Sequence, residues 1–223
     1  MKRNVVIIAA IAIIVAIGAW SYSAYWTYTT RTAVIALVTG AGERLKPALT
    51  VQPSEQADFE GGAQALEKDV AALRKLDTGS MLPLADAADG YLVTVREILK
   101  RRTAMRSVRE RQVKELEALT QHMQSDRGKA AWPREAVRLK DNVDREFRDY
   151  RIATESYATL LESLPGAQAK ITEHVKSVWL ADEKAIRDAR AAALDALARS
   201  DENIRKVIQL DAYRARRRQG GIK

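Results

Sequence analysis

The chain opens with an apolar stretch and then changes to heptad-like spacing. Residues 5–26 contain no charged side chain, and Lys2 and Arg3 precede them. At about 1.5 Å per residue these roughly 22 residues reach about 33 Å, enough to cross a hydrocarbon core of about 30 Å. Aromatic residues suited to a membrane interface follow: Trp20, Tyr22, Tyr25, Trp26 and Tyr28. The pattern predicts a transmembrane anchor over residues 5–28.

A cleaved signal peptide is the alternative interpretation of the same residues. Lys2 and Arg3 would form its basic region and residues 5–17 its apolar region, with cleavage after Gly18. The apolar stretch, however, continues past Gly18 into the aromatic residues. This continuation favours a retained anchor.

The flanking charges predict the orientation of the anchor. Lys2 and Arg3 lie directly against one end, whereas Arg31, Arg44 and Lys46 lie farther beyond the other. By the positive-inside rule, residues 1–4 form a short cytoplasmic tail and the main domain lies outside the cytoplasm. In a bacterium this means the inner (plasma) membrane and the periplasm.

Beyond the anchor, apolar residues recur at intervals of three and four residues, and this spacing predicts a series of helices. The first, over residues 32–45, can continue the membrane helix; the others are expected over 54–76, 83–125 and 132–164, with a last helix from 171 to 200 or to 213. Ser54 would cap the second of these helices. Lys46-Pro47, residues 77–80, residues 126–129 and Pro165-Gly166 would end the helices.

The fold class predicted is all-α, with one N-terminal transmembrane helix followed by an elongated antiparallel bundle. Sustained spacing near 3.5 indicates coiled-coil-like packing of three to four long helices. The helix over 83–125 would be roughly 65 Å long, and the C-terminus would finish far from the bilayer. The expected parts are a cytoplasmic tail (1–4), an anchor with an aromatic belt (5–28), a helical bundle domain (29–213) and a basic flexible tail (214–223).

Charge adds two basic clusters to this picture. The net charge is +8, and the clusters lie at residues 96–114 and in the C-terminal tail. Most charges on a helix form its solvated face, and we expect this of residues 96–114. The tail is the stronger candidate for an electrostatic contact with an anionic surface, through Arg214, Arg216, Arg217 and Arg218.

Four polar or aromatic residues lie on the predicted apolar stripes. Arg102 and Gln112 share the face of the 83–125 helix that should be buried, so we predict both as buried polar residues. A buried Arg102 would need a carboxylate, for which Asp144, Glu146 or Glu155 are candidates, unless its long side chain reaches solvent. Tyr150 and Tyr157 are one heptad apart and are interpreted as core, with a small pocket as the alternative.

The sequence has few residues that could perform catalysis. It has no cysteine, and its histidines, His122 and His174, lie on different predicted helices outside any metal-binding spacing. It also lacks a nucleophile elbow, a phosphate-binding loop and a dinucleotide-binding turn. We therefore expect no enzyme activity, no metal and no cofactor.

These expectations favour a single-pass membrane-anchored scaffold or accessory subunit that binds a partner protein outside the cytoplasm. Self-association remains an open alternative for the helical surfaces, and nucleic acid is not an expected partner. A second interpretation is a ligand-sensing bundle that acts through a partner. A third inverts the topology and makes a cytoplasmic basic helical domain, because Arg31 and Lys46 also flank the anchor.

Overall fold

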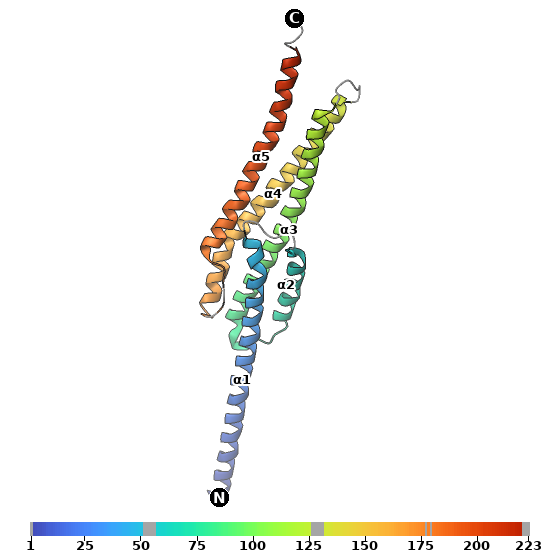
Figure 1. Cartoon of the computed structure of the whole chain (residues 1–223). Helices are drawn as coiled ribbons and strands as arrows, with labels where there is room; N and C mark the ends of the chain where they lie inside the picture. The colour runs from blue at the N-terminus through green and yellow to red at the C-terminus, as the bar shows by residue number, and fades with distance from the viewer. Residues whose placement is uncertain (1, 51–56, 126–131, 177, 179, 220–223) are drawn as a thin grey trace.

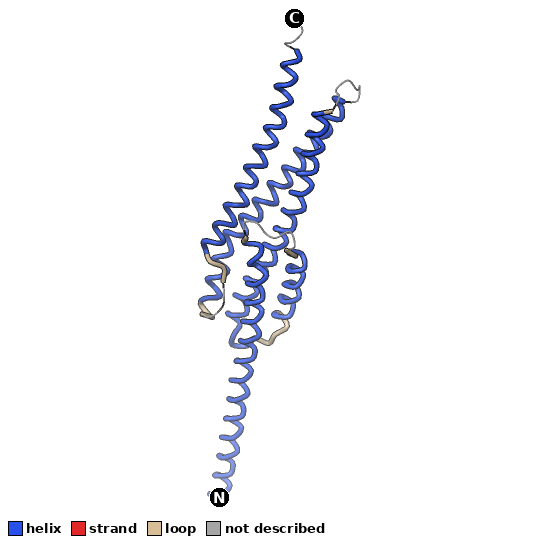
Figure 2. Tube along the Cα trace, in the orientation of Figure 1, coloured by secondary structure: helices blue, strands red, loops and turns tan. Residues whose placement is uncertain are grey.

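The computed structural model is helical throughout the part of the chain that it describes (Figure 1). The elements are α1 (Lys2–Leu49), α2 (Phe59–Leu73), the 3-10 helix η1 (Gly79–Met81), α3 (Leu82–Gln124), α4 (Trp132–Thr172) and α5 (Glu183–Gln219). The structure describes the backbone of residues 2–50, 57–125, 132–176, 178 and 180–219, and the side chains of residues 18, 20–50, 57–79, 81–125, 132–176, 178 and 180–209. No strand occurs in this backbone, as Figure 2 shows, which confirms the all-α fold class.

The helices form an elongated antiparallel bundle whose two termini lie at opposite ends (Figure 1). The long helices α3 and α4 pair with each other and form its centre. The second half of α1, together with α2, packs on the half of α3 nearer the N-terminus. Helix α5 packs on α4 and then extends toward the other end of the bundle.

Helix α1 is continuous from the apolar N-terminal stretch into the bundle. A buried stripe of α1 in the bundle follows heptad spacing and consists of Val34, Val38, Ala41, Leu45 and Ala48; Thr30, Gly42 and Leu49 are buried as well. Lys46-Pro47 does not end the helix where the sequence predicted, because Pro47 lies in the last turn of α1, which closes at Leu49. The buried neighbours Leu45 and Ala48 hold that turn against the bundle.

Among the residues that the structure describes, no helix combines the length and the hydropathy needed to cross a membrane. Residues 5–17 of the predicted anchor lie outside the described side chains.

Helix α2 begins later than the sequence predicted. The predicted cap, Ser54, lies outside the described residues, and Asp58 caps the helix instead by accepting a hydrogen bond from the Gly61 backbone N–H at 2.7 Å. A Cβ atom at position 61 would lie too close to the Asp58 carboxylate, which would have to shift to accommodate a larger residue. The helix ends at Leu73, three residues before the predicted end.

Helix α4 passes through Pro165-Gly166, where the sequence predicted a stop. A proline inside a helix costs about 3 kcal/mol. Leu161, Leu164 and Ile171, on either side of the proline, are all fully buried, and each such side chain contributes about 1.5–3 kcal/mol. Burial therefore outweighs the cost of the proline, and α4 continues to Thr172.

Helix α5 differs from the predicted last helix at both ends. It begins at Glu183 and not at the predicted Ile171. Ile171 belongs to α4, and Val175 lies in the connection between the two helices. Ser200-Asp201 does not break it, and its backbone remains helical to Gln219, through most of the predicted tail 214–223. The side chains of residues 210–223 lie outside the described ones.

Tyr157 joins α4 to the C-terminal end of α1. Its hydroxyl donates to the Ala48 carbonyl at 2.6 Å, which is one of the carbonyls that a helix end leaves without an intrahelical partner. The side chain is fully buried, and this burial raises the pKa of Tyr157 to about 12. The phenol therefore remains a hydrogen-bond donor at neutral pH.

We predict that Tyr157→Phe lowers the free energy of unfolding by about 1–3 kcal/mol, because it leaves a buried carbonyl without a donor. Thr154→Val is the matched comparison, since the buried Thr154 hydroxyl has no hydrogen-bond partner among the described residues. This second change should leave stability unchanged or raise it by about 1 kcal/mol. Denaturant unfolding of the two variants provides the measurement, and equal destabilisation by both would contradict the assigned role of Tyr157.

Candidate functional site

The five predicted interface aromatics form an exposed collar on α1. Their side chains are between 44% (Trp26) and 74% (Trp20) exposed. Because successive residues of a helix are rotated by about 100°, residues 20, 22, 25, 26 and 28 point in directions all around the helix. The collar, defined as Trp20, Tyr22, Tyr25, Trp26 and Tyr28, lies just before Thr30, the first buried residue of α1 among the described side chains.

The basic cluster at residues 96–114 is partly neutralised by carboxylates. Arg96 and Lys100 both contact Glu97, at 2.9 and 3.8 Å. Arg106 pairs with Glu110 one turn away, at 3.2 Å. The side chains of these pairs are partly exposed, and such pairs contribute little to stability. The cluster is therefore largely a solvated, charge-paired face of α3.

Arg102 is half-buried and is not paired with any of the three carboxylates predicted for it. Its guanidinium carbon lies 5.3 Å from the centre of the Tyr157 ring, an arrangement in which the ring face stabilises the cation. Glu146 instead binds Arg111, at 3.0 Å. The prediction of a buried Arg102–carboxylate pair is wrong for the described residues, because a tyrosine occupies the facing position on α4.

Gln112 is fully buried, as predicted, and belongs to a polar cluster between α3 and α5. Its Nε2 donates to the Ser200 hydroxyl at 2.7 Å. Arg109 donates to the same hydroxyl at 2.8 Å and to the Gln112 side-chain oxygen. Ser200 is 1% exposed, and the Arg109 guanidinium also lies over the buried Tyr150 ring. These three polar side chains join α5 to the α3–α4 pair.

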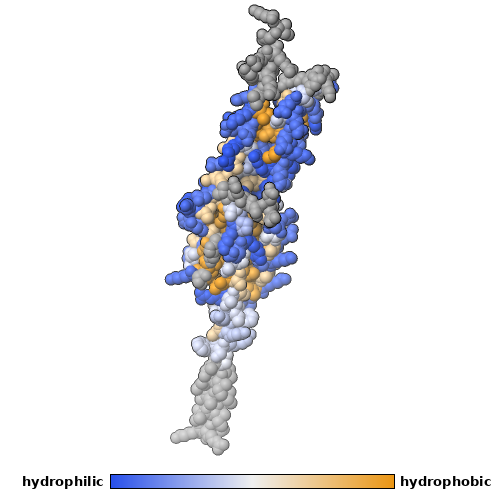
Figure 3. Space-filling view, viewed as in Figure 1, coloured by the Kyte–Doolittle hydropathy of each residue, from blue (hydrophilic) through white to orange (hydrophobic). Residues whose placement is uncertain are grey.

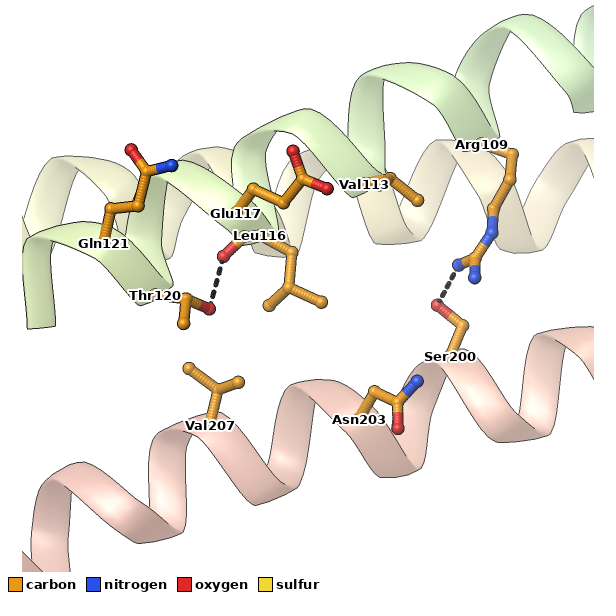
Figure 4. A pocket seen from close by; sticks show the side chains of 9 residues that line it. All are labelled: Arg109, Val113, Leu116, Glu117, Thr120, Gln121, Ser200, Asn203 and Val207. Carbon is orange, nitrogen blue, oxygen red and sulfur yellow. Dashed lines mark hydrogen bonds between the residues drawn. The ribbon is translucent and has the colours of Figure 1, made fainter. Parts of the chain in front are cut away.

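Beyond this cluster a groove lies between α3 and α5, and side chains of both helices face it (Figure 4). Ile204 is the last buried residue of α5 among the described side chains. The groove has a volume of about 480 Å³, and its apolar lining comes from Val113 and Leu116 on α3 and Val207 on α5. Figure 3 shows apolar surface within the otherwise hydrophilic distal half of the molecule. We call this the α3–α5 groove.

The α3–α5 groove carries opposite charges at two positions on α3. Arg109 is half-buried at one end and forms no ion pair with a carboxylate in the described part of the chain. Glu117 is exposed, lies two turns farther along α3 and likewise forms no ion pair among the described residues. A partly desolvated guanidinium with only neutral neighbours is an unsatisfied electrostatic site.

A second hollow of about 480 Å³ lies along the surface of α3 and α4. Glu97, Arg101 and Glu155 line it together with the exposed Ile152. Helices α3 and α4 pack directly against each other, so they leave no space between them that could enclose another molecule. It is a weaker candidate for a binding site than the α3–α5 groove.

The two histidines have structural contacts. The His122 ring stacks on Trp132 with centroids 4.9 Å apart, and the Trp132 indole N–H donates to the His122 carbonyl at 3.1 Å. This contact joins the facing ends of α3 and α4. The His174 carbonyl accepts a hydrogen bond from Arg31 at 3.2 Å. Across the described residues, no group of three or more His, Cys, Asp or Glu is placed to hold a metal ion.

Sequence reasoning found Gln112 and the apolar stripes but missed the groove. Ser200 is one of the two ends predicted for the last helix, although its spacing from Ala193, Leu197 and Ile204 places it on the buried face of α5. A small polar residue on an apolar stripe was the available signal for a partner of Gln112. The contacts of Arg214, Arg216, Arg217 and Arg218 stay a prediction, since these side chains lie outside the described ones.

Comparisons with family models, curated proteins and solved structures find no match to this chain.

We predict that Ser200→Ala lowers the free energy of unfolding by about 1–3 kcal/mol, because it leaves the buried Gln112 amide without its acceptor. The matched control is Ser163→Ala, which removes an exposed hydroxyl bonded only to its own helix at Leu160. The control should change stability by less than about 0.5 kcal/mol. Thermal unfolding combined with limited proteolysis of α5 measures both effects, and an unchanged S200A protein would contradict the joining role of the cluster.

Proposed function

We propose that this protein is a single-pass membrane-anchored helical scaffold that binds a partner protein outside the cytoplasm. The α3–α5 groove supports the proposal that the protein binds a partner. In this groove, apolar side chains of two helices face solvent at the end of the bundle far from the N-terminus. Apolar surface bordered by polar residues is typical of protein-binding sites.

The anchoring part rests on the sequence of residues 5–28 and on the exposed collar. A helix that packs on one neighbour buries one face, but the collar exposes aromatic rings in all directions. A membrane interface surrounds a helix on every side and favours amphipathic rings such as Trp and Tyr at that depth. The collar would then lie at the bilayer surface, directly beneath the bundle.

Continuity of α1 connects these two parts. The helix that would cross the membrane also supplies the buried stripe Val34, Val38 and Leu45 of the bundle, with no loop between them. The bundle would therefore stand away from the bilayer on a stiff helical connection. Helix α3 alone has 43 residues, which corresponds to about 65 Å. This length would place the α3–α5 groove far from the membrane surface, where it can reach a partner.

Topology is tested with single cysteines, since the natural sequence contains none. We expect Lys114→Cys, exposed on α3, to react with a membrane-impermeant maleimide on intact cells. Asn4→Cys should react only after the membrane is permeabilised. The reverse labelling would support the inverted topology, and release of the protein by alkaline carbonate without detergent would contradict the anchor.

Partner binding is tested by purifying the tagged full-length protein from native membranes in mild detergent, at low and at moderate salt. We expect one protein to co-purify in stoichiometric amount at both salt concentrations, because an apolar contact is not screened by ions. Mass spectrometry identifies it. A solitary protein, or one that loses every companion at moderate salt, would contradict the scaffold proposal.

A further inference from the structure

We infer that the α3–α5 groove binds an amphipathic helix of another protein through an acidic side chain that pairs with Arg109. The inference rests on the proposed function and specifies the partner's chemistry. Its first support is the charge of the groove: in the described part of the chain, Arg109 donates hydrogen bonds to Gln112 and Ser200 and lies over the Tyr150 ring, and all three groups are neutral. A carboxylate from outside is the group that a half-buried guanidinium lacks.

The second support is the shape and lining of the groove. Two helices, α3 and α5, form its walls, and Val113, Leu116 and Val207 lie between them (Figure 4). Val113 is 36% exposed, and the other two side chains are half-buried. Helical ligands are held in such grooves through side chains spaced three, four and seven residues apart. The geometry thus suits a helix lying along α3.

The third support is the charge order along α3, which predicts a pattern in the bound helix. Arg109 and Glu117 are eight residues apart, or about 12 Å along the helix. A helix that lies along them would place a carboxylate near Arg109 and a basic residue about two turns away, near Glu117. Apolar residues between those two positions would contact Val113 and Leu116. The partner is therefore expected to carry Asp or Glu, then an apolar stripe, then Lys or Arg.

The test uses the full-length protein in native membranes with photoreactive benzoyl-phenylalanine at Val113 or at Val207. Val137 is the matched control, because it is 58% exposed and does not line the groove. It also lies near the distal end of the α3–α4 pair, where Asn142 bonds to Glu115 at 3.0 Å. We expect both groove positions, but not Val137, to cross-link to one segment of a different protein that has the predicted charge pattern.

Substitution of Arg109 then tests the carboxylate. We expect Arg109→Gln to lower the cross-link yield at least about tenfold, since a partly desolvated charge pair loses one member. Ser200→Ala weakens the attachment of α5 but retains the guanidinium, so its cross-link yield should fall much less than that of R109Q. Equal losses in R109Q and S200A would mean that Arg109 only supports α5, and would overturn the inference.

Four further outcomes would overturn it: a cross-link to a second copy of this chain, a cross-link to lipid, equal yield at Val137, or no cross-link at either groove position. The co-purification experiment separates the two proposals. A stoichiometric partner that never cross-links from Val113 or Val207 would leave the scaffold proposal standing and refute the groove as its binding site. Absence of any partner in both experiments would refute both.

Discussion

The antiparallel pairing of α3 with α4 is the interaction on which the rest of the structure depends. The two helices have 43 and 41 residues and share a buried stripe that runs from Leu84 to Met123 on α3. Two helices alone leave part of such a stripe exposed, so other elements must cover it. Helix α1 ends at Leu49, and α2 is short. These two helices therefore cover only the half of the α3–α4 pair that lies nearer the N-terminus. The distal half depends on α5.

Helix α5 covers the distal half incompletely, and the candidate site results from this. Small side chains, Ala189 and Ala193, allow its first half to approach α4 closely. The polar cluster of Arg109, Gln112 and Ser200 then holds α5 to α3, and beyond Ile204 no buried residue follows among the described side chains. The α3–α5 groove begins where these contacts end, and Arg109 serves both the cluster and the groove.

The sequence predicted the helices better than their ends and their partners. Three-and-four spacing identified α3 almost to the residue, because its apolar stripe is regular and its ends carry clear breaks. The predicted helix end at Pro165 is wrong because a proline indicates only the local cost to the helix backbone. The burial of Leu164 and Ile171, which offsets this cost, depends on tertiary packing. Local signals alone therefore placed the end of α4 too early.

Side-chain partners require the register between helices, which one sequence does not contain. Arg102 and its three candidate carboxylates were correctly assigned to neighbouring helices, yet the register of α3 on α4 brings Tyr157 over the guanidinium and leaves Glu155 exposed. Ser200 shows the same limit, since its role appears only when α5 lies beside Gln112. The collar on α1 could be named without knowledge of the helix register, because its five side chains are exposed and were identified from their positions beside the apolar stretch.

Among the described side chains, α5 is buried as far as Ile204, and we propose that another molecule binds beyond this residue. Hydrogen–deuterium exchange of the full-length protein in native-like membranes tests this claim most directly, with and without its co-purified partner. We expect slow exchange over residues 186–204 in both states, together with faster exchange over 205–209 that slows when the partner is bound. Equal protection along α5, unaffected by the partner, would contradict it.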